Sequence, residues 1–170
     1  MTIFNLRSVR LRSGEQYRDR LAVALEPFVL GGQRYEPTPA EIEAEFVTSR
    51  VSSGSMFELS FAVVLRGPCY RCLGEAELVA RISDRQYQAT APDSEEETTP
   101  YLADERLDLS AWARDAIGLA VPEQILCRTE CAGLCGGCGA NLNLEACSCP
   151  PVEADTRWGK LAELRNRLSS

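Results

Sequence analysis

The sequence has no histidine among its 170 residues. This excludes Cys/His and Ser/His/Asp catalytic arrangements and any catalytic metal bound through imidazole. No apolar run approaches the roughly 18 residues of a membrane span, and residues 1–12 lack the continuous apolar stretch of a secretory signal. No Walker-type phosphate loop is present, because cysteines interrupt the glycine-dense segment 133–139. We therefore expect a cytoplasmic protein that is not an enzyme and has neither a membrane segment nor a small-molecule substrate.

Charge is distributed unevenly along a chain whose formal net charge is −7. Residues 1–20 hold five arginines against two acids, and residues 156–170 hold four basic residues against one acid, so both ends are basic. Residues 93–108 hold seven acids and one arginine. The net negative charge disfavours non-specific binding to a phosphate backbone over the whole surface, although either basic end could bind RNA locally.

Alternating apolar and polar residues predict a small antiparallel β-sheet or barrel-like domain. Segments 41–51 and 57–65 alternate on either side of a Ser-Ser-Gly-Ser turn, which predicts a hairpin. Segment 76–89 is expected to extend the same sheet, and segment 1–11 to add a further strand. Acidic residues 93–108 are expected to form a loop, in which residues 93–100 are exposed and mobile.

Apolar residues at helical spacing predict a helix over residues 109–121, which would place the fold in the α+β class. Asp108 is positioned to cap its start and Pro122 to end it, while Trp112 should pack on the sheet. We therefore divide the chain into a β domain, 1–121, and a cysteine-rich zinc-knuckle region, 122–170. A second, basic helix is predicted over residues 155–168, which could dock on the protein itself, on a partner protein or on RNA.

The eight cysteines form four close pairs with none left over. Clustered thiols in the reducing cytosol favour metal binding over disulfides, and two close pairs are the usual source of the four thiolates of a tetrahedral zinc site. Glycines after the Cys-x-x-Cys turns let the backbone wrap tightly around the sulfurs. We therefore predict two structural zinc sites of four cysteines each, with the ligands Cys69, Cys72, Cys127, Cys131, Cys135, Cys138, Cys147 and Cys149.

The grouping of the pairs follows from their separation along the chain. Cys135, Cys138, Cys147 and Cys149 lie within fifteen residues and are expected to form a local site. By elimination, the pair at 69 and 72 should join the pair at 127 and 131. A single occupied zinc, an iron–sulfur cluster, a redox pair and a disulfide scaffold remain alternatives.

The string CRTECAGLCGGCGANLNLEACSC, preceded by AVPEQIL and followed by DTRWGKLAEL, resembles the YceD family of large ribosomal RNA subunit accumulation proteins. The upstream strings GGQRYEPTP and GPCYRCLGEAEL are similar to the same family, so the resemblance covers nearly the whole chain. It implies a bacterial cytosolic protein, without catalytic activity, that is needed for normal levels of large-subunit ribosomal RNA. The chain departs from the family's usual terminal motif at Trp158 and Gly159.

The resemblance and the two basic ends lead to a hypothesis of a zinc-binding factor for large-subunit biogenesis that binds pre-ribosomal RNA, a ribosomal protein, or both. One alternative is an acidic chaperone of a basic ribosomal protein that makes no RNA contact. Another is a redox sensor that releases zinc when the Cys147 and Cys149 pair is oxidised. The residues proposed to contact RNA or a partner are Arg71, Arg128, Arg157, Lys160, Arg165 and Arg167.

Overall fold

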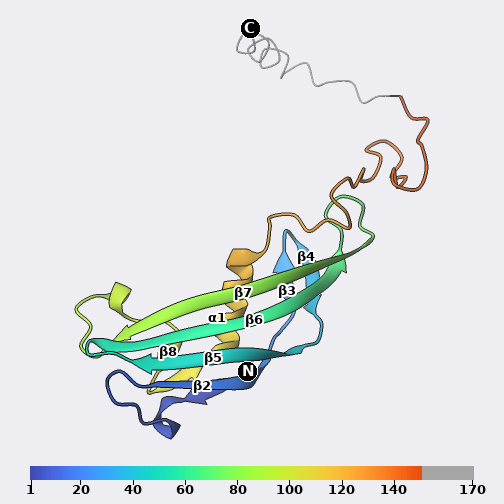
Figure 1. The fold of residues 1–170 in the computed structure, drawn as a ribbon. Helices are drawn as coiled ribbons and strands as arrows, with labels where there is room; N and C mark the ends of the chain where they lie inside the picture. The colour runs from blue at the N-terminus through green and yellow to red at the C-terminus, as the bar shows by residue number, and fades with distance from the viewer. Residues whose placement is uncertain (151–170) are drawn as a thin grey trace.

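The longest feature of the fold is a hairpin of two 15-residue strands, and the cysteine-rich segment lies beyond its tip (Figure 1). The computed structural model describes residues 1–150. Its strands are β1 (Ile3–Asn5), β2 (Gln16–Ala24), β3 (Phe28–Leu30), β4 (Gln33–Pro37), β5 (Glu41–Arg50), β6 (Gly54–Pro68), β7 (Glu75–Ala89), β8 (Leu102–Ala103) and β9 (Arg106–Asp108). The helices are α1 (Leu109–Ala120) and the 3-10 turns η1 (Leu6–Ser8) and η2 (Glu95–Glu97).

Strand β6 organises the main antiparallel sheet. Strand β7 pairs with it along its whole length, from the Gly54–Ala89 pair to the Pro68–Glu75 pair. The other edge of β6 is shared, with β5 beside its first half and β4 beside its end. Strand β2 pairs with β5, and β3 with β4. In residues 1–150 no pairing joins β2 to β7, so the sheet is open and the barrel-like alternative is wrong.

The predicted strand segments 41–51, 57–65 and 76–89 are confirmed, because alternate residues of β5 and β6 point into a buried core. This core lies between the sheet and α1, and mixes aromatic with branched aliphatic side chains. Fully buried members contributed by these two strands are Ala44, Phe46, Phe57, Leu59, Val63 and Leu65. The opposite face carries ion pairs between neighbouring strands, such as Arg18 with Glu45 and Arg66 with Glu77.

Helix α1 forms as predicted and covers the core. The Asp108 carboxylate accepts a hydrogen bond from the Ala111 N–H at 3.0 Å, which satisfies one of the free amides of the first turn. Trp112 is fully buried, stacks on Tyr101 and donates its indole N–H to Asp84 of β7 at 2.6 Å. This bond satisfies the one polar atom of the tryptophan side chain, so the whole indole can be buried.

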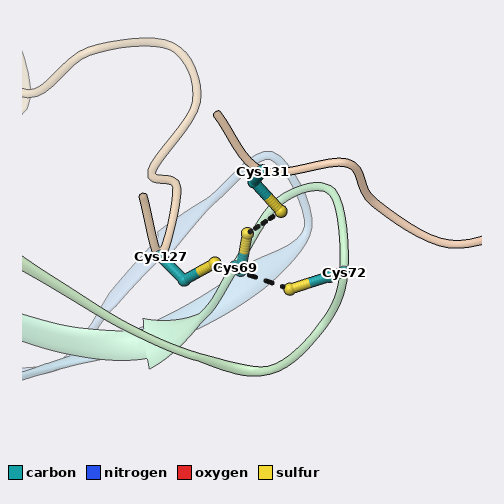
Figure 2. Close-up of side chains that lie close together, drawn as sticks. All are labelled: Cys69, Cys72, Cys127 and Cys131. Carbon is teal, nitrogen blue, oxygen red and sulfur yellow. Dashed lines mark hydrogen bonds between the residues drawn. The ribbon is translucent and has the colours of Figure 1, made fainter. Parts of the chain in front are cut away.

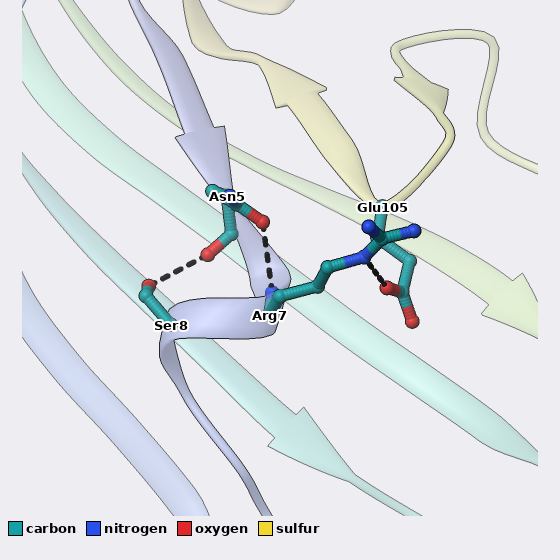
Figure 3. Close-up of polar contacts among 4 residues, drawn as sticks. All are labelled: Asn5, Arg7, Ser8 and Glu105. Carbon is teal, nitrogen blue, oxygen red and sulfur yellow. Dashed lines mark hydrogen bonds and ion pairs between the residues drawn. The ribbon is translucent and has the colours of Figure 1, made fainter.

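The ends of the β domain differ from the prediction. The predicted strand 1–11 is only the three-residue β1, because the chain then turns through η1, where Ser8 donates to the Asn5 carbonyl and the Asn5 side chain accepts from the Arg7 N–H (Figure 3). Arg7 also pairs with Glu105 in the β8–β9 turn.

Residues 93–108, predicted to be a loop, contain η2, β8 and β9. Strand β9 pairs with both β1 and β8 to make a three-stranded sheet, in which Leu107 is fully buried. Thr99, within the segment predicted to be exposed, is also buried. The acidic segment therefore contributes Leu107 and Thr99 to the buried interior, although most of its charged residues are exposed.

Several predictions on the remaining chain stay open. The basic helix predicted over 155–168 lies outside the described residues, as do Arg157, Lys160, Arg165 and Arg167. The domain boundary after residue 121 remains a prediction, and Ile125 belongs to the same buried cluster as the sheet. Among the helices of residues 1–150, none has the length and hydropathy of a membrane span.

Candidate metal centre

The tip of the β6–β7 hairpin holds the first Cys-x-x-Cys pair. The Cys69 N–H donates to the Gly74 carbonyl at 2.6 Å, and the Leu73 N–H donates back to the Cys69 carbonyl at 3.0 Å. Leu73 adopts a left-handed φ of 58°, which completes the tight turn between the strands. The hairpin therefore fixes Cys69 and Cys72 on a rigid turn.

The chain after α1 brings the second pair to this turn. The Tyr70 N–H donates to the Ile125 carbonyl at 2.8 Å, which ties the hairpin tip to the segment that precedes Cys127. The four sulfurs then point toward one another (Figure 2). We call this group, Cys69, Cys72, Cys127 and Cys131, the inner tetrad.

The sulfur spacing in the inner tetrad fits one tetrahedral ion. The Sγ atoms of Cys69 and Cys131 lie 3.7 Å apart, as do those of Cys72 and Cys127, and all four lie within 4.8 Å of one another. Zinc–thiolate bonds of about 2.3 Å give a tetrahedron with edges of about 3.8 Å. The four donors and their separation therefore match a zinc site with four thiolate ligands.

Three of the four inner cysteines belong to the hydrophobic core. Cys69 is fully buried, and Cys72 and Cys131 keep only 7% and 3% exposure. They pack in one cluster with the sheet and helix residues. An ion here would link the sheet to the segment after α1 from inside the core.

The remaining cysteines, Cys135, Cys138, Cys147 and Cys149, form the outer tetrad, and their sulfurs also lie within 4.8 Å of one another. The first turn is closed by the Cys135 N–H to the Ala140 carbonyl at 2.8 Å and by the Gly139 N–H to the Cys135 carbonyl at 2.9 Å. The sulfur of Cys147 approaches those of Cys135 at 3.3 Å and Cys138 at 3.5 Å. The structure thus makes the predicted grouping of the pairs, while the metal-ligand role of each cysteine stays a prediction.

Burial and hydrogen bonds shift the pKa values of the inner thiols in opposite directions. Burial acts to raise the pKa of Cys69, but N–H groups of Cys72, Cys127 and Arg71 outweigh it and lower the value to about 6. Loss of solvent, together with hydrogen bonds that the Cys127 thiol donates to the neighbouring sulfurs, raises its pKa to about 12. A divalent cation that binds four thiolates displaces any protons the sulfurs carry.

The outer tetrad shows the same opposite pKa shifts, although its cysteines are less buried. N–H groups of Cys138 and Gly137 lower the pKa of Cys135 to about 6. The Cys149 N–H acts to lower the pKa of Cys147, but hydrogen bonds with the thiols of Cys135, Cys149 and Cys138 raise it to about 12. Backbone amides aimed at sulfur stabilise thiolates, which suits both tetrads to a cation.

Two arginines predicted to contact RNA lie beside the inner tetrad. Arg71 donates from Nη1 to the Cys131 carbonyl at 3.2 Å, and Arg128 donates from Nη2 to the Asn143 side chain at 2.7 Å. Both side chains remain exposed. Each makes a hydrogen bond within the protein, and its role in binding RNA or a partner stays a prediction.

Asn143 is the main site residue that the sequence analysis missed. It lies in the loop of the outer tetrad, yet its Nδ2 donates to Cys131 Sγ of the inner tetrad at 3.4 Å. The Asn-Leu-Asn string at 141–143, between two cysteine pairs, was the signal for a turn built by amide side chains. Its reach to a distant thiolate depends on the tertiary fold and had no sequence signal.

The fold and the tetrads define an α+β protein with two sites that could hold metal ions. A family model described as "Large ribosomal RNA subunit accumulation protein YceD" matches residues 57–165, more than half of the chain and all eight cysteines. The chain belongs to the YceD family. No solved structure matches the chain.

The relatives extend beyond the chain. An uncharacterised protein of Mycobacterium tuberculosis is 30% identical over 130 residues, which is 74% of this chain and 62% of that protein. The chain therefore spans less than two thirds of that relative. A protein of Arabidopsis thaliana named large ribosomal RNA subunit accumulation protein YCED homolog 1, chloroplastic, is 37% identical over 62 residues, or 36% of this chain and 19% of that protein.

Proposed function

We propose that the chain is a non-enzymatic, cytoplasmic factor of large ribosomal subunit biogenesis that supports the accumulation of large-subunit ribosomal RNA. Membership of the YceD family supports the process, and the two cysteine tetrads support a structural metal. In this proposal the protein binds pre-ribosomal RNA, a large-subunit ribosomal protein, or both.

Zinc is the metal that the donor sets suit best. Four thiolates fill a tetrahedral ion and leave no open position for a reacting water, so the chemistry that zinc supplies is structural. The inner tetrad would hold the segment after α1 against the hairpin tip, where Arg71 and Arg128 are exposed. The metal would thus fix the geometry of a surface rather than take part in a reaction.

Elemental analysis of the purified full chain tests the metal. The expected result is two zinc ions per chain, falling to one in both Cys69→Ser and Cys138→Ser. Iron with visible colour would replace zinc in the proposal with an iron site or cluster. A chain with neither metal would refute a metal-held surface.

The cellular role is tested by depleting the protein and measuring the ratio of large- to small-subunit ribosomal RNA. Depletion should lower this ratio, and the wild-type gene should restore it. Complementation by Cys69→Ser should fail in proportion to its loss of zinc. A ratio unchanged by depletion would refute the proposed role.

A second candidate, a chaperone for a basic ribosomal protein, is favoured by the surface charge. Residues 1–150 hold 22 acids against 14 arginines, and four of these arginines pair with acids across neighbouring strands. A pull-down from cell extract before and after nuclease treatment separates the candidates. Association that survives nuclease supports a protein partner, and association lost with the RNA supports RNA binding.

A further inference from the structure

The loop of the outer tetrad reaches into the ligand environment of the inner one through a single side chain. Asn143 lies between Cys138 and Cys147 in sequence, but its Nδ2 donates to Cys131 Sγ at 3.4 Å. Its position is set by the turn that the outer tetrad closes, since its own N–H and Nδ2 both donate to Asn141 Oδ1, at 3.0 and 2.8 Å.

The orientation of the Asn143 amide is fixed by its partners. Its Oδ1 accepts from Arg128 Nη2 at 2.7 Å and from the Ala132 N–H at 2.9 Å, so only the nitrogen can face the sulfur and Asn141. Two donors and two acceptor positions are all that an amide offers, and all four are used. A flipped amide would set donor against donor at Arg128 and Ala132.

The backbone around this contact is equally constrained. Gly133 adopts a left-handed φ of 77°, and a Cβ there would lie 3.3 Å from the Arg71 carbonyl oxygen. The Leu142 N–H donates to the Gly133 carbonyl at 3.0 Å, which pairs the Asn143 turn with the stretch of chain that follows Cys131. The outer loop is therefore packed against the chain that follows the inner tetrad.

We infer that Asn143 is a positioning residue that couples the two tetrads, so that closing the outer loop around its ion strengthens the hold of the inner tetrad on its own. An N–H donor to a metal-bound thiolate withdraws charge from sulfur and fixes its direction, and loss of such partners typically weakens metal binding about 10- to 100-fold. The inference rests on the proposed metal binding and goes beyond it by coupling the two sites through one side chain.

The test uses Asn143→Asp in the full chain. Aspartate keeps oxygens for the Arg128 and Ala132 donors but replaces the nitrogen that donates to Cys131 and to Asn141 with a second oxygen. Leu144→Asp is the matched control, because it adds the same charge in the same loop on a side chain that is 84% exposed. The readout is the rate of zinc release to a chromogenic chelator, which should show a fast outer phase and a slow inner phase.

Asn143→Asp should accelerate the slow phase by about 10- to 100-fold, while Leu144→Asp leaves it unchanged. Cys138→Ser, which breaks the outer tetrad, should accelerate the same slow phase. In the double variant, Asn143→Asp should increase this rate little further, because both substitutions act through the contact between Asn143 and Cys131. Equal slow phases in the two aspartate variants, or additive effects of Asn143→Asp and Cys138→Ser, would overturn the coupling.

A spectroscopic readout separates this role from general loosening. With cobalt(II) in place of zinc, losing the N–H donor to Cys131 should shift the thiolate-to-cobalt charge-transfer band to lower energy in Asn143→Asp but not in Leu144→Asp. An unshifted band overturns the contact. A wild type that binds neither zinc nor cobalt overturns the proposed function as well, so the two failures are distinguishable.

Discussion

The two tetrads use the same four donors in opposite settings. The inner tetrad joins sulfurs 62 and 55 residues apart in sequence and is largely buried in the core, whereas the outer tetrad joins sulfurs 9 and 12 residues apart on an exposed loop. Cross-linking distant segments removes more freedom from the unfolded chain than closing a short loop. The inner site is therefore expected to stabilise the fold, and the outer site to shape a local surface.

The largest expected effect is the difference between removing one inner and one outer ligand. Cys69→Ser should lower the free energy of unfolding by about 4 kcal/mol or more, because it removes a metal link and leaves a hydroxyl in the core. Cys138→Ser should lower the free energy of unfolding by only about 1–2 kcal/mol, because the outer tetrad affects the rest of the fold through the contact of Asn143 with the inner tetrad. Thermal and denaturant unfolding of both variants measures this contrast.

The control for that contrast is Trp112→Phe, which disturbs the core without touching a sulfur. It should destabilise the chain, since it loses the hydrogen bond to Asp84, and leave two zinc ions bound. Equal losses of stability from Cys69→Ser and Cys138→Ser would contradict a division between a structural and a local site.

The order of metal loss is the second way to break the comparison. Chelator should take the outer ion first, because Cys138 and Cys149 are exposed while Cys69 is inaccessible to solvent. We expect the two release rates to differ by at least about tenfold, as local opening of a loop costs far less than opening the core. Stopped-flow absorbance with a zinc-sensitive dye gives both rates.

Assignment of the two phases needs the single-ligand variants. The fast phase should vanish in Cys138→Ser, and the slow phase in Cys69→Ser. If the slow phase is instead missing from Cys138→Ser, the outer site is the tighter one and the comparison is reversed.

The strong, local patterns of the sequence predicted the long β5–β6–β7 meander, α1 with its Asp108 cap, and the grouping of the cysteines. Strand β2 was missed because it lies at the sheet edge, where only Val23 is fully buried and charged residues hide the alternation. Strands β3 and β4 are too short for a periodic signal. Asn143 was missed for another reason: its role depends on a contact that only the folded chain creates.

A smaller effect is expected from glycine positions that face the two tetrads. Gly133→Ala should cost about 1–2 kcal/mol, because alanine disfavours the left-handed φ of 77° and its Cβ would press on the Arg71 carbonyl. Gly137→Ala should cost less, since its Cβ would meet Cys149 Sγ at 3.4 Å, an ordinary contact, without a left-handed φ. Thermal unfolding with zinc analysis compares the two, and a larger loss at Gly137 would contradict the tighter packing of the inner site.

The smallest effect on stability is expected at the exposed arginines, where it can be separated from RNA binding. Arg71→Gln removes a bond to the Cys131 carbonyl and should cost about 1 kcal/mol or less with both zinc ions retained. If Arg71 contacts a phosphate, the slope of log binding constant against log salt should fall by about 0.7–0.9, measured by fluorescence anisotropy with a large-subunit RNA fragment. Arg85→Gln, on the ion-paired outer face of β7, is the control and should leave this slope unchanged. The same slope in the wild type, Arg71→Gln and Arg85→Gln would show that Arg71 beside the inner tetrad does not contact RNA, and would leave the tetrad a purely structural site.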